Sequence, residues 1–392
     1  MSRICPNSSL LSVIVFAAAV TASAQQFERE FGWSLTVEPA EVRKAERRPP
    51  VKPHSESDSE EIRVETDLVL SDLLVQDRNG APVGGLKATD FEITENGSPQ
   101  LIDVFAYGDS SIPRSIILVI DHSLSQLPYI DLSIESAKVL VDAMRPNDRM
   151  AVVSDDIVLV SEFSSDKEHL KSALESLKMK CSGGKFGKSN QYSALFATLN
   201  ERISRNGTRN IVIFQTDGDE LFMVSKPRAH RSSNFGLADI VSVAERKGVT
   251  IYSVYTGPRL ADRTGKERIE HMRREIDQQL RAYAAARGNP PPKGPSNLSK
   301  QYILSRAERS IAEEKAVGSV AEDTGGLAQS LESPDQAGAV YERILSDIGR
   351  RYLIGYYPPE RSESEIRERE VRITLRNKGD FRVVGGRTYV AY

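Results

Sequence analysis

Apolar and polar residues follow two different rhythms along the chain. From residue 62 to 104, and again near the end, short runs alternate apolar with polar side chains, which is the pattern of half-buried β-strands. Asn-Gly pairs at 79–80 and 96–97 separate the runs of the first region, and such pairs favour hairpin turns. We therefore predict an N-terminal β module over residues 61–110 and C-terminal strands over 350–392.

From Pro113 onward, apolar strands are separated by amphipathic helices. The expected strands read SIILVID, RMAVVS, IVLVSEF, NIVIFQTD and VTIYSVYTG. A capping-box pattern at 165–168 predicts a helix start, and Gly248 predicts a helix end. This alternation predicts an α/β fold over residues 113–349, a doubly wound, mostly parallel sheet with helices on both faces. Because the two terminal regions are alike in pattern, we expect them to form one small β-sandwich-like module in which the α/β domain is inserted.

Residues 257–312 interrupt the alternation with charged helical sequence around the proline-rich segment NPPPKGPSN. Charges of both signs mix with Ala and Leu there, which is typical of an exposed helical excursion. We expect a helical insertion in the α/β domain, with a dedicated binding element as the alternative.

The first 24 residues have the features of a signal peptide. Arg3 precedes the apolar run Leu10 to Val20, and Ala22-Ser23-Ala24 supplies a small-x-small cleavage pattern. We expect cleavage before Gln25 and export to the periplasm or beyond the cell. The apolar run is shorter than the about 20 residues that a membrane-spanning helix needs, and no later run reaches that length, so no transmembrane segment is expected. Residues 25–60 are polar with blocks of like charge, which predicts a disordered linker.

Composition narrows the classes of partner. The chain has 392 residues, 39% of them hydrophobic, and a formal net charge of −3. This balance lacks the excess of Lys and Arg that nucleic-acid binding needs, so no nucleic-acid partner is expected. Loss of Cys5 with the signal peptide leaves Cys181 alone, which excludes an intramolecular disulfide.

Oxygen-bearing side chains gather where the predicted parallel strands end. Asp121, Ser123 and Ser125 leave the first α/β strand at alternate positions, so a tight loop can aim all three toward one point above the sheet. Ser193 and Asp217 lie at two further strand exits, on the edge where open α/β sheets bind ligands. Oxygen ligands with few carboxylates suit a hard divalent cation, so we predict a site for Mg²⁺, or for Mn²⁺ or Ca²⁺.

The motif Asp121-His122-Ser123-Leu124-Ser125, the hydroxyl residue that opens SALFATL and the aspartate of TDGD resemble the von Willebrand factor type A domain with its metal-ion-dependent adhesion site. The resemblance covers roughly residues 113 to 347. The flanking β regions look like the ends of VWFA-related proteins of Acidobacteria. Ser stands at position 193 where the family prefers Thr, and Leu124 stands where Gly is common.

This resemblance implies roles for the same five residues. Ser123, Ser125 and Ser193 would ligate the cation directly, and Asp121 and Asp217 would act directly or through water. The cation would then recruit a carboxylate from a protein partner, as in cell adhesion. We expect the neighbouring acids Asp219 and Glu220 to be solvated at the rim of the site, and His122 to point away from the ion.

Enzymatic alternatives lack parts of their machinery. A haloacid-dehalogenase phosphatase needs a second Asp where Ser123 stands, and neither Ser123 nor Ser125 lies in a Gly-x-Ser-x-Gly nucleophile elbow. The stretch Gly183 to Ser189 has the wrong glycine spacing for a phosphate-binding loop. We therefore expect no enzymatic activity. The alternatives are an envelope structural or assembly protein with a degenerate metal site, and a hydrolase with Asp121 as the nucleophile.

Overall fold

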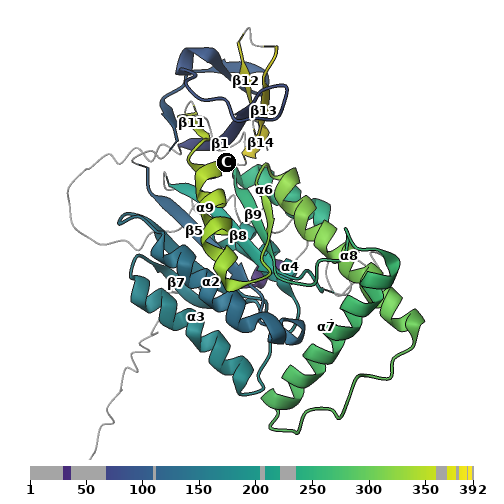
Figure 1. Ribbon diagram of the computed structural model, residues 1–392. Helices are drawn as coiled ribbons and strands as arrows, with labels where there is room; N and C mark the ends of the chain where they lie inside the picture. The colour runs from purple at the N-terminus through teal and green to yellow at the C-terminus, as the bar shows by residue number, and fades with distance from the viewer. Residues whose placement is uncertain are drawn as a thin grey trace, which may run out of the picture.

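The chain folds into an α/β domain that carries a β module at one end (Figure 1). The computed structural model describes residues 30–36, 68–108, 112–203, 208–220, 235–358, 369–376, 379–385 and 387–390. The predicted signal peptide, residues 1–24, lies outside the described residues.

A six-stranded sheet forms the centre of the α/β domain, in the order β10-β9-β8-β5-β6-β7. All neighbouring strands are parallel except the edge strand β7, which pairs antiparallel with β6. The sheet confirms the predicted fold class. The strands are β5 (Arg114–Ile120), β6 (Arg149–Ser154), β7 (Val158–Ser164), β8 (Arg209–Thr216), β9 (Thr250–Tyr255) and β10 (Ala328–Ser330).

Helices cover both faces of this sheet. Along β5, Ile116, Leu118 and Ile120 pack into one core, whereas Ile117 and Val119 pack into the core on the other face. Because side chains alternate between the faces of a strand, β5 must be apolar at every position to be buried on both sides. The first face is covered by α2 (Ile130–Asp142), α3 (Lys167–Ser182) and α9 (Ala337–Ile348), and the second by α4 (Gln191–Glu201), α6 (Leu237–Lys247) and α8 (Lys300–Asp323).

The region predicted as a helical insertion contributes α7 (Gly265–Ala286) and the first part of α8. These two helices and Leu260, which precedes α7, form a separate small core that also contains Met272, Ile276, Ile303 and Ala307. The predicted end of the insertion at residue 312 lies inside α8, which runs on without a break and buries Val317 and Val320 in the main core.

Strands from both ends of the chain build the β module. One sheet has the order β13-β1-β11-β4 and the other β14-β12-β2-β3. Both sheets contribute to one apolar core that contains Leu73, Phe91, Ile93, Tyr352 and Ile354, as expected for the predicted sandwich-like module. The strands are β1 (Val69–Gln76), β2 (Phe91–Glu95), β3 (Ser98–Gln100), β4 (Val104–Tyr107), β11 (Tyr352–Tyr356), β12 (Arg369–Leu375), β13 (Arg382–Val384) and β14 (Arg387–Val390).

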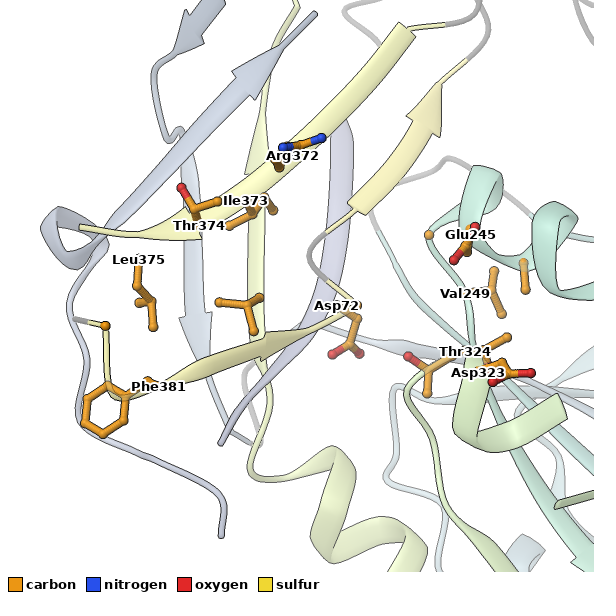
Figure 2. Close-up of a pocket in the computed structure, with 16 residues that line it drawn as sticks. Asp72, Glu245, Val249, Asp323, Thr324, Arg372, Ile373, Thr374, Leu375 and Phe381 are labelled. Atoms are coloured by element: carbon orange, nitrogen blue, oxygen red, sulfur yellow. The ribbon is translucent and has the colours of Figure 1, made fainter. Parts of the chain in front are cut away.

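A cavity of about 820 Å³ lies between the β module and the α/β domain (Figure 2). Arg372 to Leu375 of β12 line one side, and Glu245, Val249 and Thr324 line the other. Val249 immediately precedes β9, so the cavity lies at the amino ends of the parallel strands, opposite the edge that carries the predicted metal site.

Residues 30–36 are ordered, in contrast to the disorder predicted for residues 25–60. They form a short 3-10 helix, η1 (Trp33–Leu35), whose backbone amides at Gly32 and Ser34 donate to the Glu201 carboxylate at 2.8 and 2.9 Å. Phe31 and Leu35 pack against the core beneath α4. These contacts offset the entropy cost of ordering this short segment.

Candidate metal centre

Two strand ends hold the Asp121 carboxylate in place. Asp121 follows β5 directly and is almost fully buried. Its Oδ1 accepts a hydrogen bond from the Ser123 amide at 2.8 Å, and its Oδ2 accepts one from the Thr216 hydroxyl, at the end of β8, at 2.8 Å. The carboxylate is therefore fixed between the two central strands.

Ser123 and Ser125 bring their hydroxyls together beside Asp121. Ser123 is fully buried, Ser125 is half-buried, and their Oγ atoms lie 3.1 Å apart. Ligand oxygens about 2.1 Å from an octahedral Mg²⁺ ion lie about 3.0 Å from each other at neighbouring positions. The spacing of these hydroxyls therefore fits two adjacent Mg²⁺ ligands. Leu124, between them, points outward and is 45% exposed, so it occupies no ligand position.

Asp217 supplies a second buried carboxylate from the end of β8. Burial and the charge of Asp219 raise its pKa, while hydrogen bonds from the Ser125 and Gln126 side chains lower it. Burial, then the charges of Asp155 and Asp217, raise the pKa of Asp121. The structure thus brings Asp121, Ser123, Ser125 and Asp217 to one place, where the donor set fits a Mg²⁺-type ion in chemistry and spacing.

Ser193 has a different hydrogen-bond partner. Its hydroxyl donates to Glu220 Oε1 at 2.8 Å, and the amides of Tyr192 and Ser193 donate to Glu220 Oε2 at 2.6 and 3.2 Å. Glu220 therefore accepts the free amides of the first turn of α4, where a negative charge is favourable. Direct ligation of a cation by Ser193 stays a prediction.

The expectation that Glu220 is solvated is wrong, because Glu220 is only 7% exposed. Its neighbour Asp219 is also paired, since Arg309 of α8 donates to Asp219 Oδ1 at 2.8 Å. The sequence carries no local signal that α4 and α8 cover them.

Asp155, which sequence reasoning missed, lies next to the centre. It follows β6, is fully buried, and accepts hydrogen bonds from the amides of His122 at 3.0 Å and Ser189 at 2.9 Å. The His122 ring is buried and lies 2.5 Å from the same carboxylate through Nδ1. The sequence does contain a feature that identifies Asp155, because this residue directly follows a strand, as Asp121 and Asp217 do.

The glycine-rich loop before α4 brings a further hydroxyl residue to Asp155. Gly187 forms a bridge with Ser123, and its amide donates to the His122 carbonyl at 3.1 Å. Ser189, two residues later, is held by Asp155 and has a positive φ of 55°. The loop is therefore tied through Ser189 to Asp155, next to the centre.

The insertion helix α7 packs beside this edge of the sheet, against η3 (Leu124–Tyr129) (Figure 1). Gln279 of α7 donates to the Ser125 carbonyl at 3.4 Å. Across the part of the chain that the structure describes, no group of three or more His, Cys, Asp or Glu side chains is arranged to hold a metal ion. A centre here therefore depends on serine hydroxyls as well as carboxylates.

No protein-family model matches this chain, and no curated protein matches it. Its structural neighbours include von Willebrand factor type A domains. The von Willebrand factor type A protein from Catenulispora acidiphila has 12% identity and a TM-score of 0.34, over 83% of this chain and 74% of that one. The corresponding domain of the type V pili tip protein Mfa5 from Porphyromonas gingivalis has 11% identity and a TM-score of 0.33, over 65% and 100% of the two chains.

BatB from Bacteroides thetaiotaomicron, a conserved hypothetical protein, has 15% identity and a TM-score of 0.35, over 61% of this chain and 98% of that one. The Acidobacterial part of the resemblance has no counterpart among these three proteins. Within the described ranges, no helix is both long and apolar enough to span a bilayer.

Proposed function

We propose that this chain is an exported, non-enzymatic protein that binds a protein partner through a Mg²⁺-type cation. The observation that carries the proposal is the convergence of the Ser123 and Ser125 hydroxyls, 3.1 Å apart, with the buried carboxylates of Asp121 and Asp217. Export is inferred from the signal-peptide pattern of residues 1–24.

In this proposal, Asp121, Ser123, Ser125 and Asp217 hold the cation, with Ser193 as a further oxygen ligand. A bound cation would offer an open coordination position to an incoming carboxylate, because the protein oxygens leave part of its octahedral shell to water. The chain's own contribution is to fix the oxygens. The Thr216 hydroxyl and the Ser123 amide hold the Asp121 carboxylate, and the short helix η3 presents the two serines.

Isothermal titration of the exported chain with Mg²⁺ and Mn²⁺ tests the proposal. We expect saturable binding to the wild type and its loss in Asp121→Ala, which removes a buried carboxylate of the centre. Asp142→Ala is the matched control, because Asp142 is an exposed aspartate of α2 that pairs with Lys171 at the surface. Binding that survives Asp121→Ala, or no saturable binding to the wild type, would overturn the proposal.

The second candidate is an envelope assembly protein with a degenerate metal site. Exposed apolar side chains on the helical insertion favour it, since Leu280 of α7 is 43% exposed and Tyr302 of α8 is 49% exposed. Such side chains are available for contacts that need no cation. This candidate predicts that the same titration detects no saturable binding of Mg²⁺ or Mn²⁺.

A further inference from the structure

Residues 30–36 dock on the α/β domain as a short segment near the amino end of the chain. The Glu201 carboxylate accepts hydrogen bonds from the Gly32 and Ser34 amides at 2.8 and 2.9 Å, and a third from the Ser34 hydroxyl. Glu201 is the last residue of α4, where the negative end of the helix dipole disfavours an acid. The contact with the segment therefore gives this acid a role that the helix alone does not.

Two further residues of the domain fit the segment closely. Arg202 lies over the Phe31 ring, 5.2 Å from its centroid. Ile157, in the turn between β6 and β7, has a φ of 61°, which is costly for a β-branched residue. Its Cγ2 would lie 2.9 Å from a Cβ atom at position 32, where φ is +97°, so the segment needs glycine there. Ile157, Glu201 and Arg202 thus form a docking surface that recognises a particular sequence.

The segment is connected to the rest of the described chain by a long tether. The 31 residues from 37 to 67 separate it from Leu68, just before β1. A chain of this length can span at most about 100 Å, which exceeds the width of a domain of this size. The segment can therefore reach the docking surface of its own molecule, or that of a neighbouring molecule, and make the same contacts.

We propose that the docking surface joins two copies of this chain, each copy binding residues 30–36 of the other. A second copy is the partner because every copy carries the sequence that fits the surface. Exchange of an identical element keeps every contact, so it costs little. In dilute solution the contact within one molecule prevails, because a flexible tether gives the segment an effective concentration in the millimolar range. This interaction needs no cation and goes beyond the proposed function.

Two complementary variants of the exported chain test the proposal. Gly32→Ala disables the segment and keeps the docking surface. Glu201→Gln keeps the segment and replaces an acceptor oxygen with an NH₂ group that faces donor amides. Their mixture should form a complex of twice the molar mass, and each variant alone should form about tenfold less of it or none. Since the contact within one molecule forms at a millimolar effective concentration, the complex should appear at or below about 1 mM.

Sedimentation equilibrium measures the molar masses. Glu168→Gln is the control for Glu201→Gln, since Glu168 lies on α3 with 86% of its side chain exposed. Mixed with Gly32→Ala, this control keeps its own segment docked and should form about as little complex as Gly32→Ala alone. The proposal is overturned if Gly32→Ala and Glu201→Gln form no complex together, or if the control mixture forms as much.

The wild type offers a second test that needs no substitution. Trp33, the single tryptophan of the chain, lies in the docked segment, so its fluorescence reports on docking. A segment that can leave its own molecule must undock without unfolding the domain. Trp33 fluorescence should therefore change at a lower urea concentration than the circular dichroism of the helices. Coincident transitions would make the segment an integral part of the domain and overturn the exchange.

Discussion

At the scale of single residues, Asp155 is packed directly against the backbone of Gly187. A Cβ atom at position 187 would lie 2.1 Å from both oxygens of the Asp155 carboxylate. The neighbouring Ser189 amide donates to that carboxylate. The Asp155 carboxylate and the loop therefore cannot move apart without loss of this hydrogen bond. Glycine is required at 187 for close approach, which ties the glycine-rich loop to the edge of the sheet.

Gly187→Ala should therefore lower the free energy of unfolding by about 1–3 kcal/mol, the usual cost of overpacking a buried site. Gly338→Ala, in the first turn of α9, is the control, because a Cβ there meets nothing within 4 Å. The control should be neutral or stabilising by up to about 1 kcal/mol. Urea unfolding checks both variants. Equal stability of Gly187→Ala and wild type would mean that Asp155 does not pack against this loop.

The contrast between predicted and missed residues has a physical cause. Asp121 and Asp217 could be predicted because each directly follows a strand of the central sheet, and parallel strands end at one edge. Ser189 and Glu220 could not, because their positions depend on how loops fold back over that edge. The positions at which strands end locate Asp121 and Asp217, but they carry no information about Ser189 and Glu220.

At the scale of elements, the regular spacing of apolar and polar residues predicted the helices and strands most reliably. Gly248 ends α6 in the left-handed conformation, with φ 61°, as predicted. The capping box predicted at 165–168 was displaced by one residue, since Asp166 caps α3 by accepting from the amides of Glu168 and His169. Ser165 and Asp166 are both good N-cap residues, so propensity alone does not choose between them.

Helix α8 places a buried acid, Glu313, near Asp217 and Asp219. Arg309 donates to Glu313 Oε1 at 2.9 Å, yet burial and then the charge of Asp219 raise the pKa of Glu313 from 4.5 to about 8. Between these two values the folded chain holds a proton that the unfolded chain has released. The stability that the protonated Glu313 contributes is therefore fully present below pH 4.5 and is lost as the pH rises through 8.

In EDTA, the free energy of unfolding should fall between pH 5 and 8, by at most about 1.4 kcal/mol per pH unit for this one group. Glu313→Gln should reduce that slope. Part of the slope should remain because burial raises the pKa of Glu220 to about 7 as well. Glu308→Gln, at an exposed position of the same helix, serves as control. Urea unfolding at pH 5, 6.5 and 8 measures these slopes. Identical slopes in Glu313→Gln and Glu308→Gln would contradict the prediction.

At the scale of the whole molecule, a buried ion network joins the β module to the α/β domain. Asp72 of β1 lies between two arginines, with Oδ1 2.9 Å from Arg351 Nε and Oδ2 3.1 Å from Arg209 Nε. Arg351 also donates to the Gly325 carbonyl at 2.8 Å and pairs with Asp347 at the end of α9. Since Arg209 begins β8, a single carboxylate connects the module to the strand that Asp217 directly follows.

Asp72→Ala should consequently lower the free energy of unfolding by about 3–5 kcal/mol, because removal of one partner leaves buried charges uncompensated on two arginines. Glu370→Ala is the matched control in the same module, since its ion pair with Arg372 lies at the surface, with side chains 32% and 55% exposed. That surface pair should contribute at most about 1 kcal/mol. Urea unfolding of the three proteins measures the difference. If the two variants lost equal stability, the junction would rest on apolar contacts, and the buried network would contribute no more than an ordinary surface pair.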